Sequence, residues 1–411
     1  MPSRSATALI VGFVLVSFNT RAPFGQVGPL APVADLSSTV VTLLGVIPPL
    51  AMGISAPFVP HLLRRLGETR LFLVASGVAL AGAVGRPFGV TGLITGTAVV
   101  SLAIGVINVL IPVYVVSRFP GRRSGPVFGA YALSMGLGSA LVALVTVPVA
   151  HLTGHWETAV AVVALPALSA LVGSRMMDDG VTAASSSAEP ARVPSTGESA
   201  AAPRVSRTWL AWSLTAFFGV QTLLFYALMA WLPSILVSTG HSVGSAGIAQ
   251  TVLIIGISLG GLLSPLIAAR SRDQSRLVAV IITLCTVGLV GLALAPGLAT
   301  ALWVPLAGVG LGGGQAVPAV LYAHRGRDHA HTAALSSFAQ SVGFLVAATG
   351  PVLLNLGHSA FGNWSTPLLI LATVCIVNLS LSWRAGKPEK LTAAGGGTWR
   401  TRWSSLRKPM P

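Results

Sequence analysis

Residues 92–123 read GLITGTAVVSLAIGVINVLIPVYVVSRFPGRR, an uncharged stretch followed directly by three arginines. The uncharged part, 92–117, is long enough to cross the ~30 Å hydrocarbon core of a bilayer as one α-helix. Basic residues immediately beyond a span are typical of its cytoplasmic end. The stretch therefore predicts a transmembrane helix whose C-terminal end lies in the cytoplasm.

The rest of the chain has the same apolar character. Of its 411 residues, 53% are hydrophobic and only 9% are charged, and the mean hydropathy is +0.80. Soluble domains carry about 25% charged residues, so this chain has too little polar surface to face water. We expect an all-α integral membrane protein.

Twelve apolar runs recur along the chain, six on each side of a polar interruption. The expected spans are 7–32, 39–60, 71–85, 92–117, 125–150, 158–176, 209–237, 244–269, 277–295, 301–323, 332–356 and 366–383. The interruption is rich in Ala and Ser and cannot bury enough apolar surface to order itself. The predicted organisation is an N-terminal six-helix bundle (1–177), a flexible cytoplasmic linker (178–207), a C-terminal six-helix bundle (208–385) and a basic cytoplasmic tail (386–411).

The positions of the basic residues predict the orientation. Lys and Arg occupy alternate loops, the linker and both ends of the chain, and Arg86 is the single basic residue in the opposite-side loops. This alternation predicts cytoplasmic termini in a bacterial-type plasma membrane, with lipid around the bundles. The net charge of +15 therefore has an explanation other than a nucleic-acid partner, which we do not expect.

The two halves resemble each other in sequence. A shift of 207 residues carries Gly105 onto Gly312, Asn108 onto Gln315 and Arg118 onto Arg325 without gaps. Transporters are often built from two such repeats, with the substrate site near the bilayer midplane between them. A transporter with a central site is therefore the expected architecture.

Arg21 is the only charged residue expected deep inside a span. It lies about 14 residues into the first run, roughly 20 Å along a helix, too deep to reach either interface easily. An arginine at the bilayer centre costs about 2.5–3.5 kcal/mol and should face a cavity or a partner. The spans offer no Asp or Glu, so two hypotheses remain: a guanidinium fork that binds a substrate anion, or an arginine that binds free carbonyls of a helix broken around Pro23 and Pro29.

Neutral polar side chains complete the predicted substrate site. These candidates are Asn108, Tyr131, Gln221, Tyr226, Gln315 and Gln340. Gln221 and Tyr226 lie five residues apart, roughly 140° around a helix, so both cannot face the cavity squarely. Polar and small-residue faces of membrane helices often serve helix packing alone. We find no acid–base or metal-ligating cluster, and therefore expect no cofactor and no enzymatic activity.

Several motifs together resemble the cyanate porter and nitroimidazole transporter subfamily of the major facilitator superfamily. The matching segments are 19–21 (NTR), 27–30 (VGPL), 105–112 (GVINVLIP), 118–120 (RFP), 221–226 (QTLLFY), 231–233 (WLP), 337–344 (SFAQSVGF) and 350–351 (GP). The resemblance implies the major facilitator fold, a monomer, a small solute and alternating access around a central cavity. One departure concerns the loop 60–70 (PHLLRRLGETR), where Arg64 replaces the acidic residue usual in the superfamily.

The sequence thus predicts a carrier of a small anionic or polar solute, such as cyanate or a small organic anion. Arg21 supplies the charge, and the neutral polar residues supply hydrogen bonds. The alternative is a drug or natural-product efflux carrier, because the lack of a cavity carboxylate disfavours only cationic drugs. A channel, a transport-like receptor and an integral-membrane enzyme are weaker alternatives.

Overall fold

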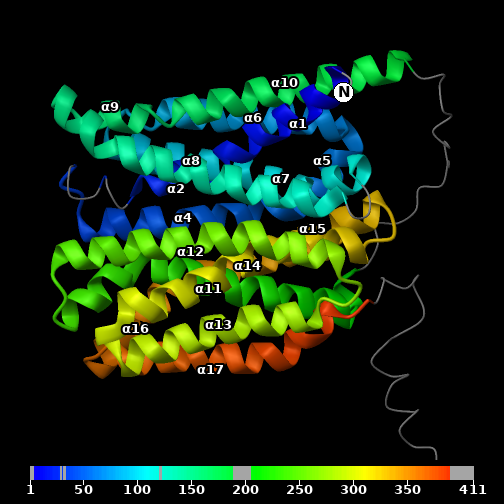
Figure 1. The fold of residues 1–411 in the computed structure, drawn as a ribbon. Coiled ribbons are helices and arrows are strands. Elements are labelled where there is room, and N and C mark those ends of the chain that lie inside the picture. Colours follow the sequence, from blue (N-terminus) through cyan, green and yellow to red (C-terminus); the bar gives the residue numbers. More distant parts are fainter. Residues whose placement is uncertain (1–3, 28–29, 31–33, 120–122, 188–204, 389–411) are drawn as a thin grey trace, which may run out of the picture.

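The computed structural model describes residues 4–27, 30, 34–119, 123–187 and 205–388, and every regular element among them is helical (Figure 1). Twelve helical spans in these residues are long and apolar enough to cross a membrane, which confirms the predicted fold class. The tail beyond residue 388 and the linker segment 188–204 lie outside the described residues.

The first half of the chain supplies six spans. Its elements are α1 (Arg4–Asn19), α2 (Ala22–Gly25), α4 (Ser38–Ser55), η1 (Ala56–Phe58), α5 (Val59–Leu66), α6 (Glu68–Gly85), α7 (Gly89–Arg118), α8 (Ser124–Thr153), α9 (Trp156–Ala161) and α10 (Ala164–Ser187). The helix α10 therefore continues into the range 178–207 that was expected to be linker.

The second half supplies the other six spans. Its elements are η3 (Val205–Arg207), α11 (Trp209–Ser238), α12 (Val243–Arg270), α13 (Ser275–Leu294), η4 (Pro296–Leu298), η5 (Ala299–Trp303), α14 (Val304–Arg325), α15 (His329–Ala348), α16 (Gly350–Phe361), α17 (Ser365–Ser382) and η6 (Trp383–Gly386). Figure 1 shows the two halves as adjacent bundles, which meet where α8 packs against α12 and α4 packs against α15.

Prolines explain where spans are interrupted. A proline lacks the N–H that would bond the carbonyl four residues earlier, and its ring crowds that carbonyl. The helix α1 ends at Asn19, four residues before Pro23. The helix α9 ends at Ala161, next to Val162, whose carbonyl cannot bond Pro166 and accepts a shorter-range bond from the Leu165 N–H at 3.0 Å instead. The expectation of one continuous helix over 7–32 was therefore wrong, and Pro29 lies outside the described residues.

Small residues set the closest helix contact in the second half. A Cβ added to Gly256 of α12 would lie 3.0 Å from the Cα of Gly308 in α14. A Cβ on Gly308 would lie 2.7 Å from the carbonyl oxygen of Leu253. Gly308 and Gly312 therefore serve close packing of α14 against α12, as small residues commonly do in membrane bundles. Gly310 packs in the same way against α13.

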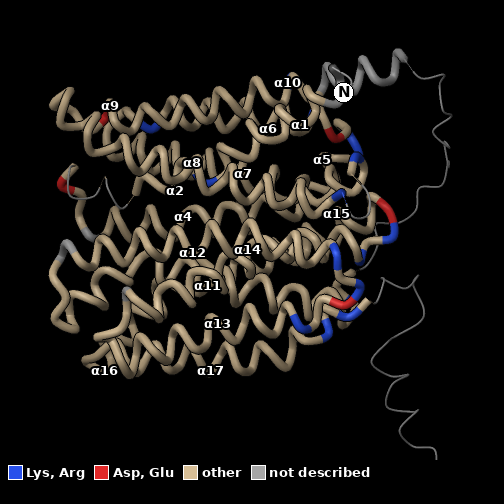
Figure 2. Tube along the Cα trace, in the orientation of Figure 1, with Lys and Arg blue, Asp and Glu red and all other residues tan. Residues whose placement is uncertain are grey.

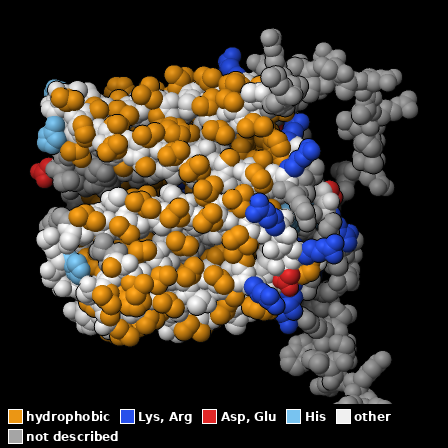
Figure 3. Space-filling view, viewed as in Figure 1, with side chains coloured by type: hydrophobic (Ala, Val, Ile, Leu, Met, Phe, Trp, Pro, Cys, Tyr) orange, Lys and Arg blue, Asp and Glu red, His pale blue; other side chains and the backbone are white. Residues whose placement is uncertain are grey.

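Charge and hydrophobicity divide the surface as a bilayer requires. In Figure 2 most Lys and Arg lie at one end of the molecule, the end that holds the label N and the loops after α5, α12 and α14. Figure 3 shows hydrophobic side chains along the flank between the two ends. This arrangement matches the pattern in which the basic end of a membrane protein faces the cytoplasm.

Candidate functional site

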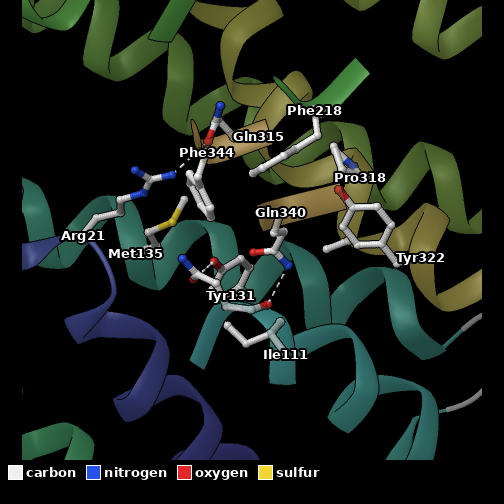
Figure 4. Close-up of a pocket in the computed structure, with 12 residues that line it drawn as sticks. Arg21, Ile111, Tyr131, Met135, Phe218, Gln315, Pro318, Tyr322, Gln340 and Phe344 are labelled. Carbon is white, nitrogen blue, oxygen red and sulfur yellow. Dashed lines mark hydrogen bonds between the residues drawn. The ribbon is translucent and has the colours of Figure 1, made fainter. Parts of the chain in front are cut away.

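A cavity lies between the two bundles, near the middle of the spans (Figure 4). Its lining comes from both halves of the chain: Arg21, Asn108, Ile111, Tyr131, Met135, Phe218, Gln315, Pro318, Ala319, Tyr322, Gln340 and Phe344. The cavity volume is about 30 Å³, and on this measure one water needs about 10–15 Å³. In this conformation the cavity therefore has room for a solute of only a few heavy atoms.

Arg21 enters the cavity because the first span is broken. Its backbone (φ −125°, ψ −11°) is non-helical and immediately precedes α2, in which Pro23 occupies the first turn. The two Nη atoms of Arg21 diverge: Nη1 donates to the Tyr226 hydroxyl at 3.0 Å and Nη2 donates to Gln315 Oε1 at 2.9 Å. Both partners belong to the opposite bundle, so the side chain joins the two halves.

The surroundings of Arg21 are polar or aromatic but uncharged. Its guanidinium carbon lies 4.9 Å from the Phe225 ring centroid and 5.9 Å from that of Tyr226, within the range of cation–π attraction. Gln315 is itself oriented by a bond from its Nε2 to Thr222 Oγ1 at 3.0 Å. Within the described part of the chain, no carboxylate pairs with Arg21. The guanidinium thus keeps a net charge and hydrogen-bond donors beyond the two in use.

A second polar group forms the opposite wall. The Tyr131 hydroxyl donates to Asn108 Oδ1 at 3.2 Å, and Gln340 Nε2 donates to the main-chain oxygen of Asn108 at 3.1 Å. Figure 4 shows Gln340 beside Tyr131, on the other side of Met135 from Arg21. All three polar residues are buried, so their mutual hydrogen bonds hold them in fixed orientations.

Apolar and aromatic side chains complete the lining. Phe218 and Phe344 pack edge to face with ring centroids 5.0 Å apart, one from α11 and one from α15. Tyr322 of α14 is buried, and its hydroxyl has no hydrogen-bond partner among the described residues. A solute in the cavity would contact aromatic faces and a free phenol as well as the guanidinium.

The structure brings most of the predicted site residues together. Five of the seven candidates line the cavity, and Tyr226 bonds to Arg21 beside it. Gln221 lies elsewhere: it is fully buried, and its Oε1 accepts a hydrogen bond from the Cys285 thiol at 3.2 Å, inside the C-terminal bundle. This separation agrees with the expected angle between Gln221 and Tyr226. That these residues bind substrate stays a prediction.

Several residues that line the cavity were not predicted from the sequence, although helical spacing could have identified them. Ile111 follows Asn108 by three positions, Met135 follows Tyr131 by four, and Phe344 follows Gln340 by four, so each pair shares a helix face. Pro318, Ala319 and Tyr322 follow Gln315 at the same periodicity. Selecting only polar residues left the apolar part of each face out.

A second arginine, which lies between the spans of α6 and α7, is buried, and the sequence does not predict this. Arg86, expected in an external loop, has no exposed surface. Its Nε donates to Thr97 Oγ1 at 3.2 Å and its Nη2 donates to the Pro23 carbonyl at 3.3 Å. Binding a carbonyl of the broken first span, one of the two hypotheses for Arg21, is therefore what Arg86 does.

The described residues contain no group of three or more His, Cys, Asp or Glu that could hold a metal ion. The two cysteines, Cys285 and Cys375, are free and buried.

Known proteins resemble this chain over nearly its whole length. The family described as Major Facilitator Superfamily matches residues 7–351. The chain is 30% identical to the 2-nitroimidazole transporter of Escherichia coli (strain K12) over 401 residues, covering 95% of this chain and 98% of that protein. It is 27% identical to the cyanate transport protein CynX of the same organism over 381 residues, covering 91% and 95%.

Solved structures agree on the fold. The proton:xylose symporter XylE superposes with a TM-score of 0.70 at 14% identity, covering 94% of this chain and 97% of the symporter. At this identity the likeness concerns the arrangement of helices alone.

Proposed function

This chain belongs to the major facilitator superfamily and is a membrane transporter rather than an enzyme, and we propose that it carries a small, flat anionic or polar solute through the cavity at Arg21. The observation that supports this most is the guanidinium at the bundle interface, held by the neutral oxygens of Tyr226 and Gln315. We place the carrier in a bacterial plasma membrane, with the basic end of the molecule in the cytoplasm.

The charge of Arg21 is costly to hold inside a membrane. Moving a guanidinium to the middle of a bilayer costs about 2.5–3.5 kcal/mol on insertion scales, and neutral partners offset only part of this. A bound anion supplies the missing charge and accepts hydrogen bonds from the remaining N–H groups, which bind planar oxyanions well. The charge is therefore better stabilised when the site is occupied.

Size and shape narrow the solute class. A cavity of about 30 Å³ suits a triatomic anion such as cyanate without rearrangement. A flat heterocycle such as 2-nitroimidazole requires the aromatic pair Phe218 and Phe344 to part, but would then stack on these rings. The named relatives transport solutes of these two kinds, which supports the same class for this chain.

Movement of the two bundles against each other provides the transport step we propose. Arg21 contacts Tyr226 and Gln315 across the bundle interface, so a solute that binds the remaining N–H groups of the guanidinium adds to the contacts that join the bundles. A ligand shifts a conformational equilibrium only through such differences in contact. On this basis we propose alternating access around the central site.

Efflux of a drug or natural product is the second candidate. The apolar wall of Phe218, Phe344 and Met135 favours it, because a larger apolar compound gains binding energy from such surfaces. Growth of a deletion strain on a panel of toxic compounds separates the two: an exporter of such compounds leaves its deletion strain hypersensitive, and an uptake carrier leaves it resistant or unchanged.

The proposed anion site is tested by counterflow into proteoliposomes preloaded with unlabelled cyanate or 2-nitroimidazole. Labelled solute should accumulate transiently with the wild-type protein. Arg21→Ala should lower this accumulation by at least tenfold for cyanate, because the anion loses its charged partner. The matched control is Arg272→Ala, which removes an exposed arginine of the loop after α12 and should transport normally. Wild-type transport by Arg21→Ala would contradict the proposed site.

A further inference from the structure

Three prolines of the N-terminal bundle each remove the α-helical donor of one main-chain carbonyl. Pro57, Pro60 and Pro112 each lack the N–H that would bond the carbonyl four residues earlier. The affected carbonyls are those of Gly53, Ala56 and Asn108. The Ala56 carbonyl keeps a shorter 3₁₀ bond from the Val59 N–H. Inside a membrane protein, such carbonyls need other donors.

Side chains of the opposite bundle supply those donors. Ser341 Oγ donates to the Gly53 oxygen at 2.8 Å, Ser337 Oγ donates to the Ala56 oxygen at 2.6 Å, and Gln340 Nε2 donates to the Asn108 oxygen at 3.1 Å. All three donors lie on α15 and are buried. They occur at positions i, i+3 and i+4, which form one helix face.

We infer that Ser337, Gln340 and Ser341, here called the α15 latch, hold the cytoplasmic side of the transporter closed by bonding to carbonyls that prolines expose. The three residues are thus positioning residues for the gate. Each bond crosses from one bundle to the other, so opening this side breaks all three together. The inference depends on the proposed carrier function only for its consequence in transport.

The latch lies in the half of the molecule near the basic end. Its acceptors Gly53 and Ala56 precede the basic pair Arg64 and Arg65 by two to three helical turns, and α15 starts just after Arg325 and Arg327. The same half brings α8 close to α12: an added Cβ on Gly125 would contact the Cβ of Ala269, and one on Gly136 would lie 3.0 Å from Ser258 Oγ.

One residue of the latch also lines the proposed substrate cavity. Gln340 lines the cavity while its Nε2 donates to Asn108 and to Ser336 Oγ, at 3.1 and 2.8 Å. An anion in the cavity competes for the same amide hydrogens. One side chain therefore links occupancy of the site with closure of the cytoplasmic gate.

The experiment measures gate opening without substrate, so that its failure is distinct from failure of the anion site. A reporter cysteine replaces Ala269, which is 9% exposed where α12 packs against α8, away from α15. Inside-out vesicles are labelled with a membrane-impermeant maleimide, and the parent with its two buried native cysteines gives the background. Faster labelling reports opening towards the cytoplasm.

Removing latch donors should favour the open gate. Ser337→Ala and Ser341→Ala should each raise the labelling rate about fivefold, and the double variant about 25-fold, because a hydrogen bond contributes about 1 kcal/mol net. The matched control is Ser213→Ala, whose hydroxyl also bonds a distant carbonyl, that of Leu381 at 2.6 Å, but within one bundle. An unchanged rate in the double variant, or an equal rise with Ser213→Ala, would overturn the inference.

A double-mutant cycle tests the role of the proline itself. Pro57→Ala restores an N–H that can bond the Gly53 carbonyl within the helix. In that background, Ser341→Ala should change the labelling rate less than twofold, because its acceptor already has a donor. Equal effects of Ser341→Ala in both backgrounds would show that proline exposure of the carbonyl is irrelevant, and would also overturn the inference. Size-exclusion profiles of all variants confirm that each is folded.

Discussion

Two arginines flank the break in the first span, and their surroundings differ in one decisive respect. Arg21 donates to Tyr226 and Gln315 on the opposite bundle and is only half-buried, beside a cavity. Arg86 donates to Thr97 and the Pro23 carbonyl within its own bundle and is completely buried. Contacts inside one bundle survive when the bundles move, whereas contacts between bundles must be exchanged. This difference supports the proposed role of Arg21 in solute binding and indicates a stabilising role for Arg86.

The largest expected effect concerns Arg86 and the free energy of unfolding. Arg86→Ala should destabilise the purified protein by about 3–5 kcal/mol, because it leaves a cavity and removes the donors to Thr97 and Pro23. Arg86→Met keeps most of the volume and should lose less. Thermal unfolding in detergent, followed by tryptophan fluorescence, measures both. A wild-type unfolding temperature for Arg86→Ala would remove the contrast between the two arginines.

A smaller effect is expected when Arg21 is replaced by a cationic side chain of different shape. Arg21→Lys should weaken cyanate binding about tenfold while leaving the unfolding temperature unchanged. A lysine ammonium is a point charge and cannot direct separate N–H groups at Tyr226, Gln315 and an anion in one plane. Isothermal titration of the purified variant gives the affinity. Binding as tight as that of the wild type would show that charge alone suffices.

The smallest effect concerns a single hydroxyl. Tyr226→Phe removes the oxygen that accepts from Arg21 Nη1 at 3.0 Å but keeps the ring beside the guanidinium. One net hydrogen bond is worth about 1 kcal/mol, so the affinity for cyanate should fall about fivefold. The same titration measures it. Unchanged or tighter binding would mean that Tyr226 restrains Arg21 rather than assisting the anion.

The spans and most of the polar residues that line the cavity could be predicted from the sequence, because both follow from local patterns. Apolar runs, alternating basic loops and the Asn108–Gln315 repeat all depend on residues close in sequence or at a fixed shift. The burial of Arg86 could not be predicted, because it depends on a carbonyl 63 residues away in the sequence. The flanking Gly85, Pro87 and Gly89 resemble an ordinary exposed loop.

Only half of each hydrogen bond in the α15 latch can be predicted from the sequence. Its acceptors could have been identified from the positions of Pro57, Pro60 and Pro112, since each proline marks the carbonyl four residues before it. Nothing local indicates that Ser337 and Ser341 reach those carbonyls from the other bundle. Prolines thus reveal which backbone groups need a partner, and only the tertiary structure shows which side chain provides it.

The uncompensated cation at Arg21 has an electrical consequence. With no acidic partner among the described residues, the empty site carries one positive charge, and the site with a monovalent anion is neutral. A full membrane crossing by one charge is worth about 2.3 kcal/mol per 100 mV, and the guanidinium experiences the fraction of that field through which it moves. A negative cell interior therefore favours the conformation in which the positively charged empty site faces the cytoplasm. It does not bias the conformations of the neutral, loaded carrier. Voltage alone would then drive solute outward, and uptake against it would need an inward solute gradient, exchange for an internal anion or a co-transported cation.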